Sequence, residues 1–170
     1  MARVQKTIEV HVPVSTAYNQ WTQFEEFPKF MEGVHTVTQL DDRRLHWEAE
    51  VGGHEKKWDA EIKEQIPDTR IIWSSIDGEQ NAGVVTFEPA ENGNATRVSL
   101  EMSYSPDGFM EKVGDTFGFM SRRVQGDLER FRDFIEMRGA ETGGYRETLR
   151  NEAAPGGFTH GRPANPVSRN

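Results

Sequence analysis

Few side chains in this sequence have the types and spacing that chemistry requires, and the histidines with nearby carboxylates are the first group to consider. His46, Glu48 and Glu50 alternate along one side of a predicted strand. A histidine with carboxylates is typical of a metal site or a general base. The residues between them, Leu45 and Trp47, are apolar, so we predict that the histidine side faces water as a solvated outer face.

The remaining candidates form no recognisable catalytic set. His35 is ambiguous because its strand has a mixed pattern, whereas His11 and His54 are predicted to be peripheral. The absence of cysteine excludes disulfides, thiolate nucleophiles and cysteine-based metal sites. No nucleophile elbow, zinc-protease motif, phosphate-binding loop or dinucleotide fingerprint occurs. We therefore predict no metal and no cofactor, and the catalytic residues stay unknown.

Charge and hydrophobicity narrow the class of partner. The 170 residues carry a formal net charge of −8, which argues against nucleic acid because duplex binding needs clustered Lys and Arg. No apolar stretch approaches the ~20 residues that span a bilayer, and the first residues lack a secretory pattern. We expect a cytoplasmic protein without stable membrane insertion, whose oligomeric state is unknown.

The elements that position these residues follow from hydrophobic periodicity. Residues 3–12 alternate as a half-buried strand, and Ser15 is predicted to cap a short helix over 16–23. An aromatic-rich helical turn, 24–31, comes next, broken by Pro28. Six segments with a period of two then indicate an antiparallel meander joined by tight turns, as at Gly52-Gly53. They are residues 34–40, 44–51, 57–63, 70–76, 83–88 and 97–104.

A long helix is predicted after Pro106-Asp107-Gly108, with Gly139 as its stop. Gly114 and Gly118 indicate either close packing against the short helices or room for a ligand. The apolar residues of this predicted helix recur every three or four positions over about seven turns. They are Phe109, Val113, Phe117, Met120, Val124, Leu128, Phe131 and Ile135.

Two further features flank this stripe. The Arg122-Arg123 pair fits the helix surface best, and it is also placed to flank a cavity mouth and attract an anionic ligand group. From Ala153 onward the chain is rich in Pro, Gly and Asn with almost nothing apolar, which predicts a flexible tail.

The order β-α-α-β6-α predicts an α+β fold in which a curved seven-stranded antiparallel sheet grips the long C-terminal helix. The inward rows of this sheet carry unusually large side chains. They either interdigitate into a solid core or line a cavity for an apolar ligand with a few polar atoms for orientation. The candidate ligand-binding residues are Trp47, Trp58, Trp73, Ser75, Phe87, Met102, Tyr104, Phe117 and Met120.

Several short segments, taken in their order and spacing, carry a resemblance to a known family over residues 3–147. They are Thr7-Ile8-Glu9-Val10 with Pro13, Trp21 to Met31, Trp58 with Ala60-Glu61-Ile62, Ile72-Trp73-Ser74-Ser75, Val85 to Pro89, Thr96-Arg97-Val98, Gly126 to Phe131 and Glu141 to Arg146. The sequence resembles the START and pollen-allergen (SRPBCC) superfamily of helix-grip proteins, and its bacterial polyketide cyclase/dehydrase-like group most closely. The Phe27-Pro28…Phe30 segment also resembles the coenzyme-Q-binding START proteins.

The resemblance implies a helix-grip ligand-binding domain over residues 1–147, followed by a flexible tail over 148–170. It implies binding of a small hydrophobic or aromatic ligand, such as a lipid, quinone or polyketide, between the sheet and the C-terminal helix. The alternative is a polyketide cyclase or dehydratase that acts on a poly-β-ketone. In that case Tyr104 or Ser75 would orient or protonate a carbonyl.

Overall fold

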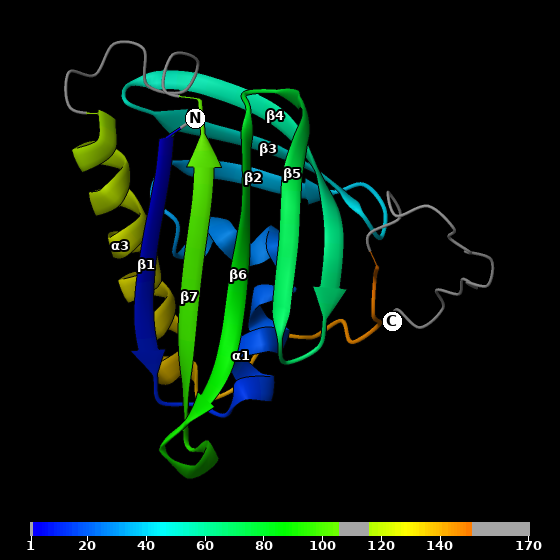
Figure 1. Ribbon diagram of the computed structural model, residues 1–170, viewed down its shortest axis with the longest axis vertical. Coiled ribbons are helices and arrows are strands. Elements are labelled where there is room, and N and C mark those ends of the chain that lie inside the picture. The colour runs from blue at the N-terminus through cyan, green and yellow to red at the C-terminus, as the bar shows by residue number, and fades with distance from the viewer. Residues whose placement is uncertain (1, 106–115, 151–170) are drawn as a thin grey trace.

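The computed structural model describes residues 2–105 and 116–150, and in this part of the chain seven strands form one antiparallel sheet. Their order is β1-β7-β6-β5-β4-β3-β2, and the sheet curls with α1 and α3 on its inner side (Figure 1). The expected helix-grip α+β fold is therefore confirmed. The elements are β1 (Ala2–Val10), α1 (Val14–Trp21), η1 (Phe24–Lys29), β2 (Val34–Gln39), β3 (Arg44–Val51), β4 (His54–Ile66), β5 (Arg70–Gly78), β6 (Asn81–Ala90), η2 (Glu91–Gly93), β7 (Ala95–Tyr104) and α3 (Thr116–Arg138).

Local features explain how the sheet bends. Gly52 and Gly53 have φ angles of 62° and 86°, the conformation that a two-residue hairpin turn requires and that glycine adopts without strain. The register between β4 and β5 shifts between Asp59 and Ala60, and again between Ile62 and Glu64. Such bulges bend a strand and increase its twist, so the long β4 curves around the interior (Figure 1).

The short helices that close one end of the sheet begin differently from the expectation. Pro13 occupies the N-cap position of α1, with no side-chain cap, and its carbonyl accepts a hydrogen bond from the Ala17 amide at 3.1 Å. The prediction that Ser15 caps this helix was therefore wrong. The following turn forms the 3₁₀ helix η1 with Pro28 inside it.

The C-terminal half of α3 packs into a solid core. Leu128, Phe131 and Ile135 are fully buried, and the Phe131 ring meets the edges of Trp21 and Phe30 with centroids 4.8 and 5.2 Å away. The helix ends at Arg138, as Gly139 predicted. The expected helical positions before residue 116 and the predicted tail from residue 153 lie outside the described residues.

A strap of residues 140–150 crosses the lower end of the sheet and α1. The Gln20 side chain and Thr142 exchange two hydrogen bonds of 3.0 and 2.8 Å. Leu149 pairs with Gln65 of β4 through two backbone hydrogen bonds of 2.8 Å. The paired chain thus extends past residue 147, where the sequence places the end of the domain.

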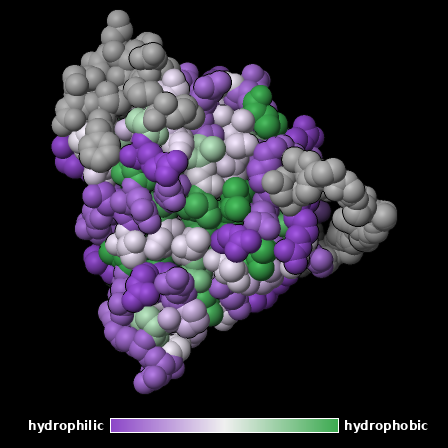
Figure 2. Space-filling model, in the orientation of Figure 1, coloured by the Kyte–Doolittle hydropathy of each residue, from purple (hydrophilic) through white to green (hydrophobic). Residues whose placement is uncertain are grey.

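The outer face of the sheet is turned toward the viewer in Figure 2. Hydrophilic side chains cover most of this face, with a few hydrophobic ones near its centre (Figure 2). The large apolar side chains lie on the other face, around the helices. The interior between sheet and helices is therefore the place to look for a ligand site.

Candidate functional site

A cavity of about 140 Å³ lies between the inner face of the sheet, η1 and the middle of α3. A void of ~150 Å³ is large enough to hold one benzene ring. The walls are almost entirely aromatic and aliphatic. The lining residues are Trp21, Phe24, Phe27, Met31, Val34, Leu45, Trp47, Ala49, Val51, Trp58, Ile62, Ile71, Trp73, Asn81, Leu100, Met102, Met120, Arg123, Val124 and Asp127.

One wall is a stacked tryptophan pair. Trp47 on β3 stands opposite Trp58 on β4 in the strand register, and their rings stack with centroids 5.5 Å apart and planes 12° from parallel. Cross-strand aromatic pairs of this kind stabilise a sheet. Both tryptophans also line the cavity.

The next part of the sheet wall, on β5 and β6, depends on a glycine. Trp73 on β5 is paired with Gly83 on β6, and a Cβ atom at Gly83 would lie 2.5 Å from Cη2 of the indole. The Trp73 indole N–H donates to Asn81 Oδ1 at 3.1 Å, and the backbone N–H of Asn81 donates to Ser75 Oγ at 3.0 Å. Gly83 therefore makes room for the indole, and Asn81 with Ser75 fixes its orientation.

The polar part of the lining lies on α3. Arg123 and Asp127 are four residues apart, so they lie on one side of the helix. The Arg123 guanidinium donates to the Glu50 carbonyl at 3.0 Å. Asp127 Oδ1 accepts from the Glu32 amide at 3.1 Å and from the Arg130 guanidinium at 2.6 Å.

Burial dominates the electrostatics of Asp127. It raises the pKa of this carboxyl to about 6, although the Arg130 and Glu32 hydrogen bonds and the charges of Arg123 and Arg130 lower it. An acid held so close to a guanidinium normally has a depressed pKa, so the low polarity of the cavity outweighs the partners. The site thus holds a carboxyl that can take up and release a proton near neutral pH.

The comparisons with known proteins agree with this geometry. Residues 10–132 match the model of the family described as polyketide cyclase / dehydrase and lipid transport. The chain belongs to this family. Over 147 residues it is also 54% identical to an uncharacterized 17.2 kDa protein in the melC2-rnhH intergenic region of Streptomyces lincolnensis, which covers 86% of this chain and 97% of the relative.

Solved structures of similar proteins share the fold. A protein from Deinococcus radiodurans is 26% identical, with a TM-score of 0.65 over 81% of this chain and 99% of that chain. The Zhui aromatase/cyclase of a Streptomyces species is 14% identical, with a TM-score of 0.66 over 85% of this chain and 99% of its own. Ligand binding and polyketide cyclase activity are both compatible with membership of the polyketide cyclase / dehydrase family.

Five of the nine residues predicted to bind a ligand line this cavity. All five are tryptophans or methionines. Ser75 does not line the cavity, but its hydroxyl accepts a hydrogen bond from the backbone N–H of Asn81, which does. The side chain of Phe117 lies outside the described part of the structure. The five lining residues are Trp47, Trp58, Trp73, Met102 and Met120.

Phe87 and Tyr104 point inward as expected but are not among the residues that line the cavity. The Phe87 ring packs against Tyr18 and Trp21, with centroids 5.5 and 6.3 Å away, because α1 covers that end of the sheet. Tyr104 is fully buried at the end of β7, opposite Asn81 and Ala2. Facing the interior is therefore not enough to face the cavity.

The prediction from sequence that Arg123 fits the helix surface best differs from its place in the cavity lining, and Asp127 was not predicted to be a site residue. Both lie on the cavity side, three and seven positions after Met120. This spacing is the helical signal that would have revealed them. Their charge masked it, since charged residues are usually assigned to the solvated face.

The His46 group lies on the outer side of the sheet, away from the cavity. Its ring nitrogens contact the Asp59 and Glu48 carboxylates at 2.6 and 3.0 Å. These hydrogen bonds raise the pKa of His46. Both ring nitrogens are occupied by neighbouring carboxylates, so the group resembles a charged clamp between β3 and β4 more than a general base.

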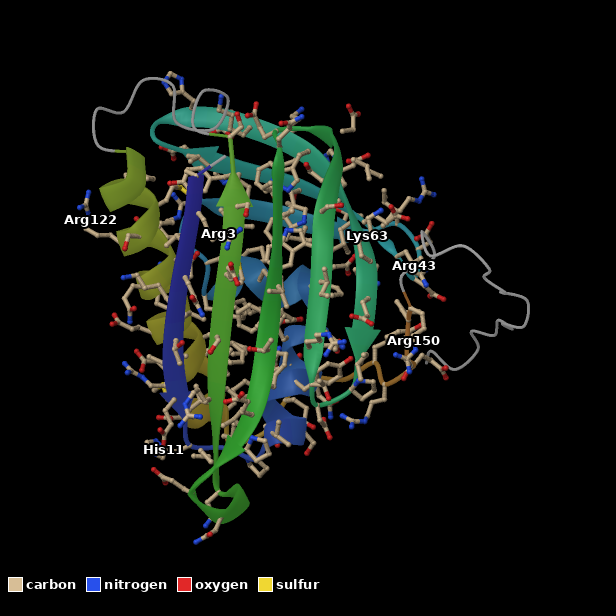
Figure 3. The ribbon with its side chains drawn as sticks, viewed as in Figure 1. Arg3, His11, Arg43, Lys63, Arg122 and Arg150 are labelled. Carbon is tan, nitrogen blue, oxygen red and sulfur yellow. The ribbon has the colours of Figure 1, made fainter. Side chains whose placement is uncertain are left out.

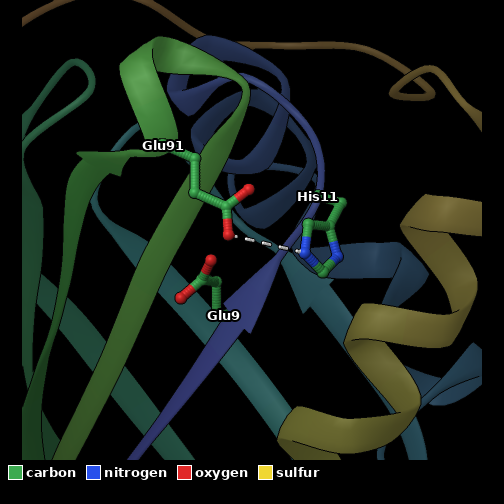
Figure 4. A group of neighbouring side chains, drawn as sticks. All are labelled: Glu9, His11 and Glu91. Carbon is green, nitrogen blue, oxygen red and sulfur yellow. Dashed lines mark ion pairs between the residues drawn. The ribbon is translucent and has the colours of Figure 1, made fainter.

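A second polar cluster, at the lower end of β1, joins Glu9, His11 and Glu91 (Figure 4). Their potential ligand atoms lie within 4.8 Å of one another, but His11 also contacts the Glu136 carboxylate at 3.2 Å. The neighbouring Glu9 raises the pKa of Glu91. The contacts of His11 are thus explained by ion pairs with exposed glutamates.

No helix in the described ranges is long and apolar enough to cross a membrane.

Proposed function

We propose that the protein binds a small hydrophobic or aromatic molecule in the cavity between its sheet and α3. The observation that carries this proposal is the lining, in which only Asn81, Arg123 and Asp127 bring an amide or a charged group. Ligand pockets are typically apolar with a few polar groups that fix orientation. The proposed partner is this small molecule and the proposed location is the cytoplasm.

Tryptophan fluorescence gives a direct test, because all four tryptophans of the chain, Trp21, Trp47, Trp58 and Trp73, line the cavity. We expect a neutral one-ring probe such as 1,4-benzoquinone to quench them saturably. Ala49→Leu should abolish saturable quenching, because Ala49 is a buried lining residue and a larger side chain fills the space. Ala82→Leu, on the outer side of β6, is the matched control. Quenching that never saturates, or that Ala49→Leu leaves unchanged, would refute the proposal.

A second candidate is a cyclase or dehydratase acting on a poly-β-ketone, and the observation that favours it is Asp127. A carboxyl whose pKa is about 6 and which lines the cavity suits proton transfer to and from a bound carbonyl compound. Under this proposal Asp127 takes the proton-transfer role that the sequence assigned to Tyr104 or Ser75. Turnover of a poly-β-ketone that disappears in Asp127→Asn would support it, and undiminished turnover would remove it.

A further inference from the structure

Arg123 is a fixed cation at the rim of an apolar cavity. Its guanidinium donates to the Glu50 carbonyl and lies over the ring of Phe119, 5.9 Å from the centroid. It also occupies the space beside Gly33, where a Cβ atom would collide with its Nη2. Gly33 has a φ of +80°, a conformation that other residues rarely adopt. The chain thus reserves this place for the guanidinium.

No carboxylate of the described residues is in direct ion-pair contact with this cation, although the charge of Arg123 reaches Asp127. Among residues 2–105 and 116–150, Arg123 forms no ion pair within 4.0 Å, whereas Arg130, two turns along α3, is paired with Asp127 at 2.6 Å and with Glu32 at 3.6 Å. The hydrogen bonds of Asp127 go from its Oδ1 to Arg130 and the Glu32 amide, not to Arg123. The charge of Arg123 therefore remains available at the cavity.

An unpaired guanidinium is a poor lining group for a neutral ligand, because part of its hydration is lost when an apolar molecule covers it. A carboxylate on the ligand would compensate for the lost hydration, since a planar guanidinium can donate two parallel hydrogen bonds to a carboxylate. The aromatic walls and the volume of about 140 Å³ suit a body of one aromatic ring.

We propose that the cavity takes a small aromatic carboxylate, whose ring lies among the tryptophans and whose carboxylate is bound by Arg123. This inference rests on the proposed function and adds the chemical class of the ligand. The half-buried position of Arg123 places the carboxylate at the rim, while the ring enters the apolar interior.

Calorimetric titration with benzoate and its neutral isostere benzamide tests the inference. We expect wild type to bind benzoate about tenfold or more tightly than benzamide, the range of a charge-assisted hydrogen bond. Arg123→Gln should bring this ratio close to one. Arg123→Lys should retain part of it, which separates loss of charge from loss of the helix-to-sheet contact. Arg122→Gln is the matched control, because Arg122 is exposed and points away from the sheet (Figure 3).

The outcomes separate the two proposals, with toluene as a third, fully apolar probe. Equal binding of benzoate and benzamide to wild type would overturn the aromatic carboxylate but leave the hydrophobic cavity standing. A benzoate preference that survives in Arg123→Gln would overturn the role of Arg123. Failure of benzoate, benzamide and toluene alike to bind would overturn the proposed function as well.

Discussion

At the scale of single residues, the Asp127 carboxyl in the cavity lining makes the stability of the protein depend on pH. Its pKa is about 6 in the folded protein and ~3.9 in an unfolded chain. An acid whose folded pKa is raised gives most stability below its unfolded pKa and loses it as pH rises through the folded pKa. The folded protein should therefore lose on the order of 2–3 kcal/mol from this group between pH 4 and pH 7.

Asp127→Asn isolates this effect, because the neutral amide does not titrate. We expect the free energy of unfolding of the variant to rise relative to wild type as pH increases from 4.5 to 7.5, as measured by urea denaturation. Taking the difference between the two proteins removes the contribution of the histidines. A difference that stays constant over this range would contradict the raised pKa.

His46 changes stability with pH in the same direction as Asp127 but at higher pH, because its unfolded pKa is higher. Asp59 and Glu48 raise the pKa of this imidazole, so its stabilising effect is complete below the unfolded pKa of ~6.5 and is lost as pH rises through the folded value. We predict that His46→Gln destabilises the protein at pH 6 and much less at pH 9. An NMR titration in which His46 titrates at or below the value of a free histidine would show that the clamp between β3 and β4 is absent.

At the scale of elements, α3 divides into a half that packs and a half that borders the cavity. Leu128 is fully buried and lies outside the cavity lining, whereas Met120 lines it. Leu128→Ala should lower the free energy of unfolding by about 2–5 kcal/mol because it opens a new void. Met120→Ala enlarges an existing space, so it should cost less stability and change ligand affinity more.

Urea denaturation and ligand titration of both variants check this division of the helix. Equal destabilisation, without any change in the binding of aromatic probes to Met120→Ala, would mean that the middle of α3 is ordinary packed core.

The same elements show what sequence periodicity can and cannot reveal. The alternation of apolar and polar residues was enough to predict that Trp47, Trp58 and Trp73 face inward, because a period of two assigns each side chain to one face of a sheet. The same alternation correctly predicted that Phe87 faces inward. Whether an inward residue contacts a helix or the cavity depends on where α1 crosses the sheet, and the alternation does not show this. The sequence could not predict that Arg123 and Asp127 line the cavity, because their positions depend on tertiary contacts with the Glu50 carbonyl and the Glu32 amide.

At the scale of the whole molecule, the strap of residues 140–150 ties the chain's end back to α1 and β4. Besides the Leu149 and Thr142 bonds, Arg146 pairs with Asp68 at 2.9 Å and donates to Asn19 at 2.7 Å. We predict that a chain ending after Gly139 loses on the order of 3 kcal/mol of stability, at about 1 kcal/mol or less for each net hydrogen bond removed.

A chain ending after Glu152 is the matched control, because it keeps the whole strap and we predict that residues 153–170 are dispensable for folding. Thermal unfolding of the two truncations against the full chain separates these predictions. Equal melting temperatures for all three would show that the strap contributes nothing, and a drop of several degrees after the Glu152 cut would show that the tail does.

We propose that this fold encloses a site for a small aromatic ligand. Native mass spectrometry of the protein purified from its own host, followed by organic extraction, measures this most directly. We predict a one-to-one complex whose released ligand contains an aromatic ring, and loss of that complex in Ala49→Leu but not in Ala82→Leu. Bare protein from the host, together with no change in tryptophan fluorescence at saturating concentrations of aromatic probes, would contradict the claim.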